Sequence, residues 1–211
     1  MITESAQQAL SILRDSSQFS WGIIPLLLLV IYIYFREAEE ENWSRILAAS
    51  AFWGMDLFNE TWNSLIFHFS EFAPVWAAPG GDTAYLFLIG LNIEISFMFA
   101  ITGIAATLSL PKDKKLKIFG LNNRLLFAIV MSVMSVIVEI ILNQIGALTW
   151  DWPFWNAQFP FLIFLVGYMP FYLVCYWVYD MECRKKQITV VISLLSFNII
   201  TLGSFASLGW L

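Results

Sequence analysis

The chain has 211 residues, of which 59% are hydrophobic and only 13% are charged, and its formal net charge is −5. An ordinary soluble domain carries about 25% charged residues, so the composition excludes one. The acidic balance makes nucleic acid an unexpected partner. Apolar stretches near the roughly 20 residues of a bilayer crossing recur without the alternation of barrel strands. The sequence therefore predicts an all-α, polytopic membrane protein, whose helices satisfy their own backbone groups in lipid.

The whole chain, residues 1–211, is expected to form a single transmembrane domain. Residues 1–19 have the pattern of a short interfacial helix, since apolar side chains recur at helical spacing and Ser5 with Gln8 matches a capping box. Residues 20–211 are expected to form a six-helix transmembrane bundle. The six predicted spans cover residues 21–35, 43–69, 83–108, 122–146, 160–179 and 187–208.

Basic residues gather in alternate loops. Ten of the eleven Lys and Arg side chains lie in or beside loops 36–42, 111–121 and 180–186, whereas Arg14 lies on the other side. Cytoplasmic loops are enriched in Lys and Arg, so both termini are predicted to lie outside. The short loops favour a multi-pass protein of a bacterial inner membrane. The acidic residues of the first loop, Glu37 among them, and Asp180 are expected to be solvated.

Tryptophan gives a second indication of placement, because its ring prefers the membrane interface. The side chains predicted at the outer surface are Trp21, Trp76, Trp150, Trp152, Trp155 and Trp210. The loops that carry them are therefore expected to lie in the headgroup region.

Ionisable residues inside the predicted spans are the informative ones. They are Asp56, Glu60 and His68 in the second span, Glu94 in the third and Glu139 in the fourth. A carboxylate near a helix centre costs about 2.5 to 3.5 kcal/mol on insertion scales, so its default interpretation is functional. The only Lys or Arg residues within the spans are Arg45 and Arg124, each at the third residue of its span, so a buried ion pair beside these acids is not expected.

Helical spacing predicts that the acids converge. Asp56, Glu60 and Asn63 lie on one narrow stripe with Trp53 nearby, and such polar stripes should face the bundle interior. In the fourth span Ser132, Ser135, Glu139 and Asn143 form a similar stripe. In the third span Glu94 is expected to share a face with Gly90, Met98 and Ile101, which leaves Asn92 to bond a neighbouring helix. The three Glu residues are expected in one layer.

These residue types suit acid and base chemistry. Burial favours the neutral carboxyl, which can deliver a proton, and an ionised carboxyl beside it can take a proton back. The predicted catalytic residues are Asp56, Glu60, Glu94 and Glu139. The predicted substrate-binding residues are Asn59, Asn63, Asn143, Trp53, Tyr168, Tyr172 and His68. For the tyrosines, helix packing is the alternative, and for His68 it is a hydrogen bond to water or a loop at the interface.

Several classes of membrane enzyme are excluded by the single histidine. Bis-His haem ligation and histidine-rich di-iron sites cannot be built from this chain, and no nucleotide-binding motif is present. We therefore expect neither a metal site nor a cofactor. The expected partners are a lipophilic small molecule and membrane lipids, and the oligomeric state stays open.

The stretch Asp56-Leu57-Phe58-Asn59-Glu60-Thr61-Trp62-Asn63 combines acid, Asn and Trp residues in a small all-helical membrane protein. In this it resembles the integral-membrane terpene cyclases of meroterpenoid and indole-terpenoid pathways. The resemblance covers this segment alone. It differs in the order of Trp and Glu and in the number of spans, six here against seven. It implies carbocation chemistry on an isoprenoid-like substrate, with Glu60 as the proton donor.

Three functions remain after these steps. The first is metal-free isomerisation, cyclisation or hydration of a lipophilic substrate by carboxyl groups. The second is a cation- or proton-coupled carrier, in which the same carboxylates bind the ion. The third is an accessory subunit whose Trp-rich loops dock on a larger complex. An enzyme is expected to enclose an aromatic pocket of several hundred cubic ångströms.

Overall fold

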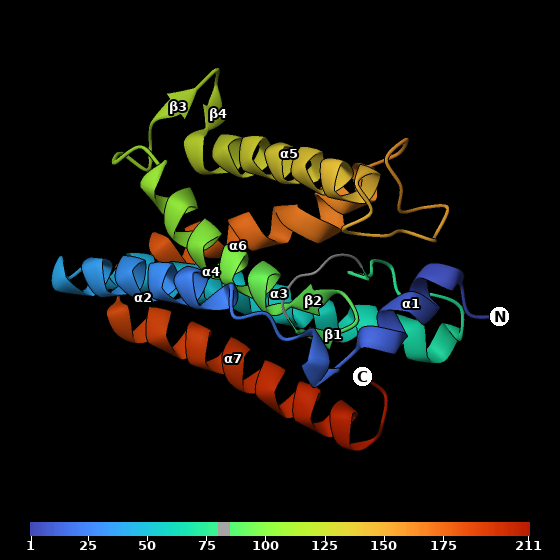
Figure 1. Cartoon of the computed structure of the whole chain (residues 1–211). Helices are drawn as coiled ribbons and strands as arrows, with labels where there is room; N and C mark the ends of the chain where they lie inside the picture. Colours follow the sequence, from blue (N-terminus) through green and yellow to red (C-terminus); the bar gives the residue numbers. More distant parts are fainter. Residues whose placement is uncertain (80–84) are drawn as a thin grey trace.

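A computed structural model describes residues 1–79 and 85–211 of the chain. Those residues are mostly helical, with two short hairpins (Figure 1). In chain order the elements are α1 Glu4–Ile12, the 3₁₀ turn η1 Ser16–Gln18, α2 Ile23–Glu39, α3 Trp43–Ser70, β1 Leu86–Leu88, β2 Leu91–Asn92, α4 Ile93–Leu108, β3 Lys117–Ile118, β4 Leu121–Asn122, α5 Asn123–Gln144, the π-helical stretch η2 Ile163–Tyr168, α6 Met169–Tyr179 and α7 Arg184–Ser207. The all-helical prediction is confirmed apart from the hairpins.

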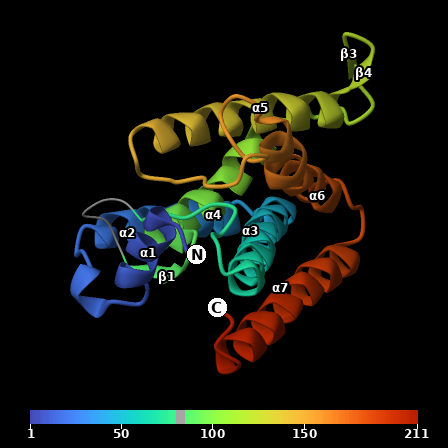
Figure 2. The same ribbon diagram turned by 90° about the vertical axis from the view of Figure 1, so that its right-hand side faces the viewer.

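The long helix α3 lies at the centre of the molecule. It packs against α4, α6 and α7, which surround it in Figure 2. Its 28 residues contain no Pro, and it ends where Glu71 adopts a left-handed φ of 50°. Helices α3 and α4 approach closely because Gly103 faces Ala49, and a Cβ atom on Gly103 would lie 2.6 Å from the Ala49 Cα atom. The predicted second span, 43–69, is thus confirmed as a helix to within one residue.

An aromatic cluster fills the space between α3, α4 and α6. The ring of Phe52 contacts Phe99, Phe171 and Tyr172, at centroid distances of 5.9, 5.5 and 4.9 Å. These rings are buried. Two of them, Phe99 and Phe171, also line the candidate site.

The third predicted span differs from the structure. Helix α4 begins at Ile93, because Asn92 accepts a hydrogen bond from the Ile95 N–H and caps the helix. The preceding residues 85–92 form the β1–β2 hairpin instead of a helix. The expected start of the span at Thr83 lies outside the described residues. The side-chain oxygen of Asn92 therefore bonds its own helix.

The N-terminal helix is confirmed, but Thr3 caps it where Ser5 was expected. Its small residues Ala6 and Ala9 are fully buried, and Ala9 belongs to a cluster that includes Ala78. The Thr3 and Ser5 hydroxyls both donate hydrogen bonds to the carboxylate of Asp151. The small residues of the apolar stripe of α1 are thus covered, whereas Leu10 of the same stripe is 40% exposed.

The three basic connections lie at one end of the helices, and both termini lie at the other (Figure 1). At the basic end Arg124 forms a two-pronged ion pair with Asp180, with both N–O distances 2.8 Å. Arg45 pairs with Glu37, which is 5% exposed. The expectation that Glu37 is solvated was wrong, because this acid is buried against Arg45. The side chain of Asp180 is 24% exposed, and Glu39, Glu40 and Glu41 are exposed, as expected.

Helices α5 and α7 are long and apolar enough to cross a membrane. Helix α4 and the continuous segment Ile163–Tyr179 are shorter apolar helices. Helices α2 to α7 occupy the six predicted segments, with η2 joined to α6, and α7 begins three residues earlier than predicted. At 1.5 Å per residue, the 16 residues of α4 extend about 24 Å.

Candidate functional site

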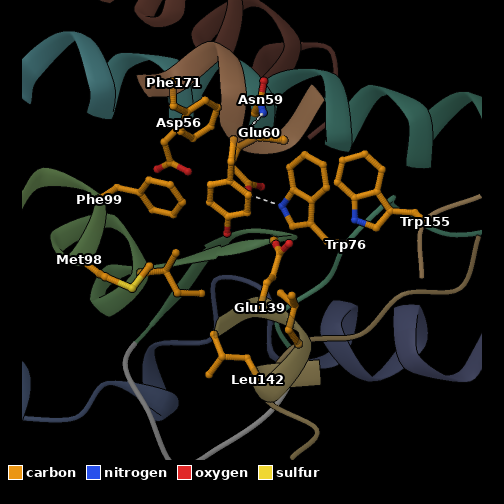
Figure 3. A pocket seen from close by; sticks show the side chains of 15 residues that line it. Asp56, Asn59, Glu60, Trp76, Met98, Phe99, Glu139, Leu142, Trp155 and Phe171 are labelled. Atoms are coloured by element: carbon orange, nitrogen blue, oxygen red, sulfur yellow. Dashed lines mark hydrogen bonds between the residues drawn. The ribbon is translucent and has the colours of Figure 1, made fainter. Parts of the chain in front are cut away.

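A cavity of about 60 Å³ lies between α3, α4, α5 and η2 (Figure 3). This is room for a few water molecules, each of which needs at least about 10 to 15 Å³. No Lys, Arg or His is among the described residues that line it. The lining residues are Asp56, Asn59, Glu60, Trp76, Gly90, Ile95, Met98, Phe99, Glu139, Leu142, Leu148, Trp155, Gly167, Tyr168 and Phe171. The pocket is aromatic, as expected, but much smaller than the several hundred cubic ångströms that we predicted.

Three carboxyl groups meet in this cavity. Asp56 and Glu60 lie one turn apart on α3 and are 3% and 2% exposed. Glu139 extends from α5 toward them (Figure 3). Asp56 lies close enough to Glu60, and Glu60 to Glu139, for their negative charges to repel each other. Each acid also has one buried oxygen without a hydrogen-bond partner among the described residues: Asp56 Oδ2, Glu60 Oε2 and Glu139 Oε2.

Glu60 is oriented by a tryptophan. The indole Nε1 of Trp76 donates a 2.5 Å hydrogen bond to Glu60 Oε1. The Trp76 ring stacks on Trp155 at 5.5 Å and meets Trp62 edge-on at 5.0 Å. Trp62 and Trp155 therefore hold the Trp76 ring in place. Oε2 of Glu60 has no hydrogen-bond partner among the described residues and is available for proton transfer.

Asn63 fixes the backbone that carries Trp76. Its Oδ1 accepts from the N–H groups of Val75 and Trp76, at 2.7 and 3.2 Å, and its Nδ2 donates to the Trp76 carbonyl at 2.8 Å. A pair of backbone hydrogen bonds between Ala77 and Thr149 ties the same loop to the segment after α5. The loop is thereby folded inward over the cavity.

The turn of the β1–β2 hairpin presses against the same two side chains. A Cβ atom on Gly90 would lie 2.5 Å from Trp76 Nε1 and 2.8 Å from Glu60 Oε1. Real Cβ atoms do not approach so closely. Only glycine therefore fits at position 90 while the Trp76–Glu60 hydrogen bond is in place.

The π-helical stretch η2 contributes the fourth wall. Pro170 has no N–H to give to the carbonyl of Val166, four residues earlier, so the α-helical ladder is interrupted there. The widened turn directs the Gly167 carbonyl at Asn59 Nδ2, 3.4 Å away. Tyr168 lines the cavity and interacts with Glu139. Such π-turns occur frequently at functional sites.

Five predicted site residues are brought together, namely Asp56, Asn59, Glu60, Glu139 and Tyr168. Glu94 is not among the residues that line the cavity. Because α4 begins at Ile93, Glu94 lies in its first turn, where an acid suits the helix dipole, and not in the middle of a span. Its expected neighbours Gly90 and Met98 do line the cavity.

The predicted amides Asn63 and Asn143 lie outside the cavity lining. Asn63 is fully buried in the loop contacts described above. Asn143 donates to the Leu148 carbonyl at 3.1 Å, across the turn that follows α5. Both amides form hydrogen bonds to loop backbone, and neither lines the cavity.

Three aromatic candidates also lie elsewhere. Trp53 donates to the Ser96 hydroxyl at 2.8 Å and lines a separate groove beside α2. The Tyr172 hydroxyl bonds with Ser135 at 2.8 Å within the aromatic cluster. His68 is exposed and stacks on Trp210 at a centroid distance of 5.3 Å.

Sequence reasoning missed the functional place of Trp76 and Trp155. Both were predicted at the membrane interface, yet they are 8% and 3% exposed and line the cavity. The available signal was the gathering of Trp residues in these two loops, which interface anchoring explains equally well. Gly90 was expected on the face of Glu94, but no sequence pattern indicated its contact with Trp76.

Comparison with known proteins places the chain among membrane proteins. The model of a family described as an uncharacterized membrane protein family matches residues 3–207. An uncharacterized protein of Archaeoglobus fulgidus is 57% identical over 208 residues, which is 99% of this chain and 98% of that protein. A second uncharacterized protein of the same organism is 49% identical over 53 residues, 25% of this chain and 95% of that protein. No solved structure matches.

Proposed function

The chain belongs to this uncharacterized membrane protein family, and on that premise we propose that it is a multi-pass membrane enzyme. Asp56, Glu60 and Glu139 serve as its proton donors and acceptors, and its substrate is lipophilic. The observation that carries the proposal is the meeting of three carboxyl groups in one apolar, aromatic cavity whose described lining holds no cationic side chain. Two carboxyl groups whose pKa values differ can act as the acid and the base of a proton transfer in an apolar site.

The geometry suggests which oxygen gives the proton. Glu60 Oε1 accepts from Trp76, so the proton of the neutral acid belongs on Oε2. Transfer to an alkene carbon forms a C–H bond, breaks the O–H bond and leaves a carbocation beside a carboxylate. Asp56 or Glu139 then removes a proton from the neighbouring carbon, which gives an isomerised alkene. Return of that proton to Glu60 resets the site.

Aromatic faces support a cationic intermediate. Phe99, Phe171 and Tyr168 line the cavity, and ring faces attract positive charge by about 0.5 to 2 kcal/mol. The small volume indicates that only the reacting end of the substrate enters. The resemblance to the membrane terpene cyclases makes an isoprenoid chain the narrower candidate, with cyclisation when a second alkene of the chain captures the cation.

The placement in the membrane is part of the proposal. We infer that all six helices α2 to α7 cross the bilayer of the cell and that the termini lie on the non-cytoplasmic side. Support comes from the common location of loops 36–42, 111–121 and 180–186 at one end of the bundle (Figure 1). Ten of the eleven Lys and Arg residues lie in or beside these loops, which favours a cytoplasmic location for that end.

A proton- or cation-coupled carrier is the second candidate. It is favoured by the volume of about 60 Å³, which suits water or a small ion, and by the three carboxyl oxygens without partners. An accessory subunit draws less support, because its acids were expected to be held in helix–helix hydrogen bonds.

Deuterium labelling separates the two candidates without a known substrate. The purified protein is incubated with an archaeal lipid extract in D₂O, and the lipids are searched by mass spectrometry for new carbon-bound deuterium. We expect wild-type protein to label a lipid and Glu60→Gln to reduce the labelling at least 100-fold. Glu39→Gln, at an exposed position, is the matched control. Absence of labelling, together with Glu60-dependent acidification of proteoliposomes, would favour the carrier.

A further inference from the structure

A second chamber of about 490 Å³ is lined by residues of both chain termini, α1 and the end of α3. Its volume falls in the range of sites for drug-sized ligands, about 300 to 1,000 Å³. The residues that line it are Met1, Ile2, Leu10, Leu13, Ser64, Phe67, His68, Glu71, Ile89, Gly209, Trp210 and Leu211. Most of these side chains are apolar. The carboxyl cavity, of about 60 Å³, is too small for a ligand of that size, and this chamber is not.

Adjacent residues separate the two spaces. On α3, Glu60 lines the cavity and Ser64, one turn further on, lines the second chamber. In the hairpin turn, Gly90 lines the cavity and its neighbour Ile89 lines the chamber. One face of α3 therefore runs from the carboxyl groups into the chamber.

Ser64 marks the inner end of the chamber. It is 3% exposed, and its hydroxyl has no hydrogen-bond partner among the described residues. A buried hydroxyl without a partner costs about 1 to 3 kcal/mol, and a ligand hydroxyl that bonds to it would offset this cost. Phe67 and Ile89 line the same chamber, and a charged group beside them would lose its hydration.

The remaining polar groups line an exposed part of the chamber. His68 is exposed and stacks on Trp210, and Glu71 is exposed. No Lys or Arg is among the described residues that line the chamber, and the Glu71 carboxylate disfavours an anion. The lining therefore suits an apolar chain that carries a neutral oxygen.

We propose that the second chamber binds a lipid alcohol, with the hydroxyl of the ligand bonded to Ser64 and its apolar chain against Phe67, Ile89 and Leu10. That this ligand is the substrate rests on the proposed function, since the chamber adjoins Glu60. Binding itself does not depend on turnover.

The test uses a photoreactive prenyl alcohol, a farnesol analogue with a diazirine, on the full chain in lipid nanodiscs. Cross-linked peptides are located by mass spectrometry. We expect labelling at Phe67 or Ile89, and competition by farnesol at least tenfold stronger than by farnesoic acid. Ser64→Ala removes only a hydroxyl without a partner, so the protein should fold, and farnesol should compete about fivefold less well.

A filling variant with a matched control completes the test. Leu10→Trp enlarges a side chain that lines the chamber from a 40% exposed position, and should reduce labelling at least tenfold. Leu28→Trp, at a 59% exposed position on α2, should leave labelling unchanged. Equal labelling of the two variants, equal competition by the acid, or labelling spread over α2 and α7 would overturn the proposal.

Glu60→Gln keeps the two proposals distinguishable. It should leave labelling of the chamber unchanged while removing deuterium transfer. Loss of the chamber labelling with intact Glu60-dependent turnover would reject the second chamber alone. Chamber labelling in a protein without Glu60-dependent turnover would reject the proposed reaction alone.

Discussion

Trp76 and Glu60 are joined by a hydrogen bond of 2.5 Å in which the indole nitrogen donates to Oε1. The two residues come from different elements, Glu60 from α3 and Trp76 from the loop after it. The bond sets the rotamer of the carboxyl group and determines which oxygen can carry its proton. The proposed chemistry depends on this contact more than on any other in the cavity.

Trp76→Phe keeps the aromatic packing and removes the donor. We expect deuterium transfer to fall about tenfold, since Glu60 loses its orientation, and stability to fall by about 1 to 3 kcal/mol because the buried Oε1 loses the hydrogen bond from Trp76. Lipid deuteration and thermal unfolding in micelles measure the two effects. Trp177→Phe, the same change at a 57% exposed position, should alter neither. An unchanged rate in Trp76→Phe would show that the hydrogen bond does not orient the acid.

Gly90→Ala should damage the site through a steric clash. The new Cβ atom would lie 2.5 Å from Trp76 Nε1, so the indole or the hairpin must move. We expect at least a tenfold loss of deuterium transfer. Gly203→Ala in α7 meets no atom within 4 Å and should raise stability by about 0.5 to 1 kcal/mol. Full activity of Gly90→Ala would show that the hairpin turn can move away from Trp76 without disturbing Glu60.

Asn63→Ala tests the support of the loop. It removes three hydrogen bonds and leaves backbone groups of Val75 and Trp76 buried without partners. We expect a loss of about 2 to 5 kcal/mol in the free energy of unfolding. Asn143→Ala removes one hydrogen bond, to Leu148, and should cost about 1 kcal/mol. Denaturant titration in micelles measures both losses, and equal losses would contradict this ranking.

The proposed orientation can be tested with the natural cysteines. Cys175 is buried and Cys183 is exposed in the turn between α6 and α7. In intact cells a membrane-impermeant maleimide should leave Cys183 unlabelled, whereas a permeant one should label it. With Cys183 replaced by Ser, a cysteine at exposed Ser207 should react with the impermeant reagent. Labelling of Cys183 by the impermeant reagent would reverse the proposed orientation.

Periodicity and charge predicted the helices well. The boundaries of α3 follow from an uninterrupted helical pattern between Asn42 and Glu71, and the convergence of Asp56 with Glu60 follows from their spacing of four residues. Glu139 was placed correctly because its stripe on α5 is polar on one side only. These are local properties that a sequence carries directly.

Long-range contacts were the part that the sequence did not reveal. The cap at Asn92 competes with continuation of an apolar helix, so Glu94 was placed too deep. Trp155 was assigned to the interface because Trp residues generally prefer that region. The sequence does not show that its ring stacks on Trp76 inside the protein. Asn63 has the spacing of a site residue, but it bonds a loop that the pattern of α3 cannot foresee.

The π-helical stretch Ile163–Tyr168 has a consequence for relatives of this protein. A π-turn takes in one residue more than an α-turn, so loss of a single residue there would restore regular winding. The segment before α6 would then rotate by about 100°, and the Gly167 carbonyl would leave Asn59. A homologue with a one-residue deletion at this point is expected to retain the helical scaffold and to lack the proton-transfer site.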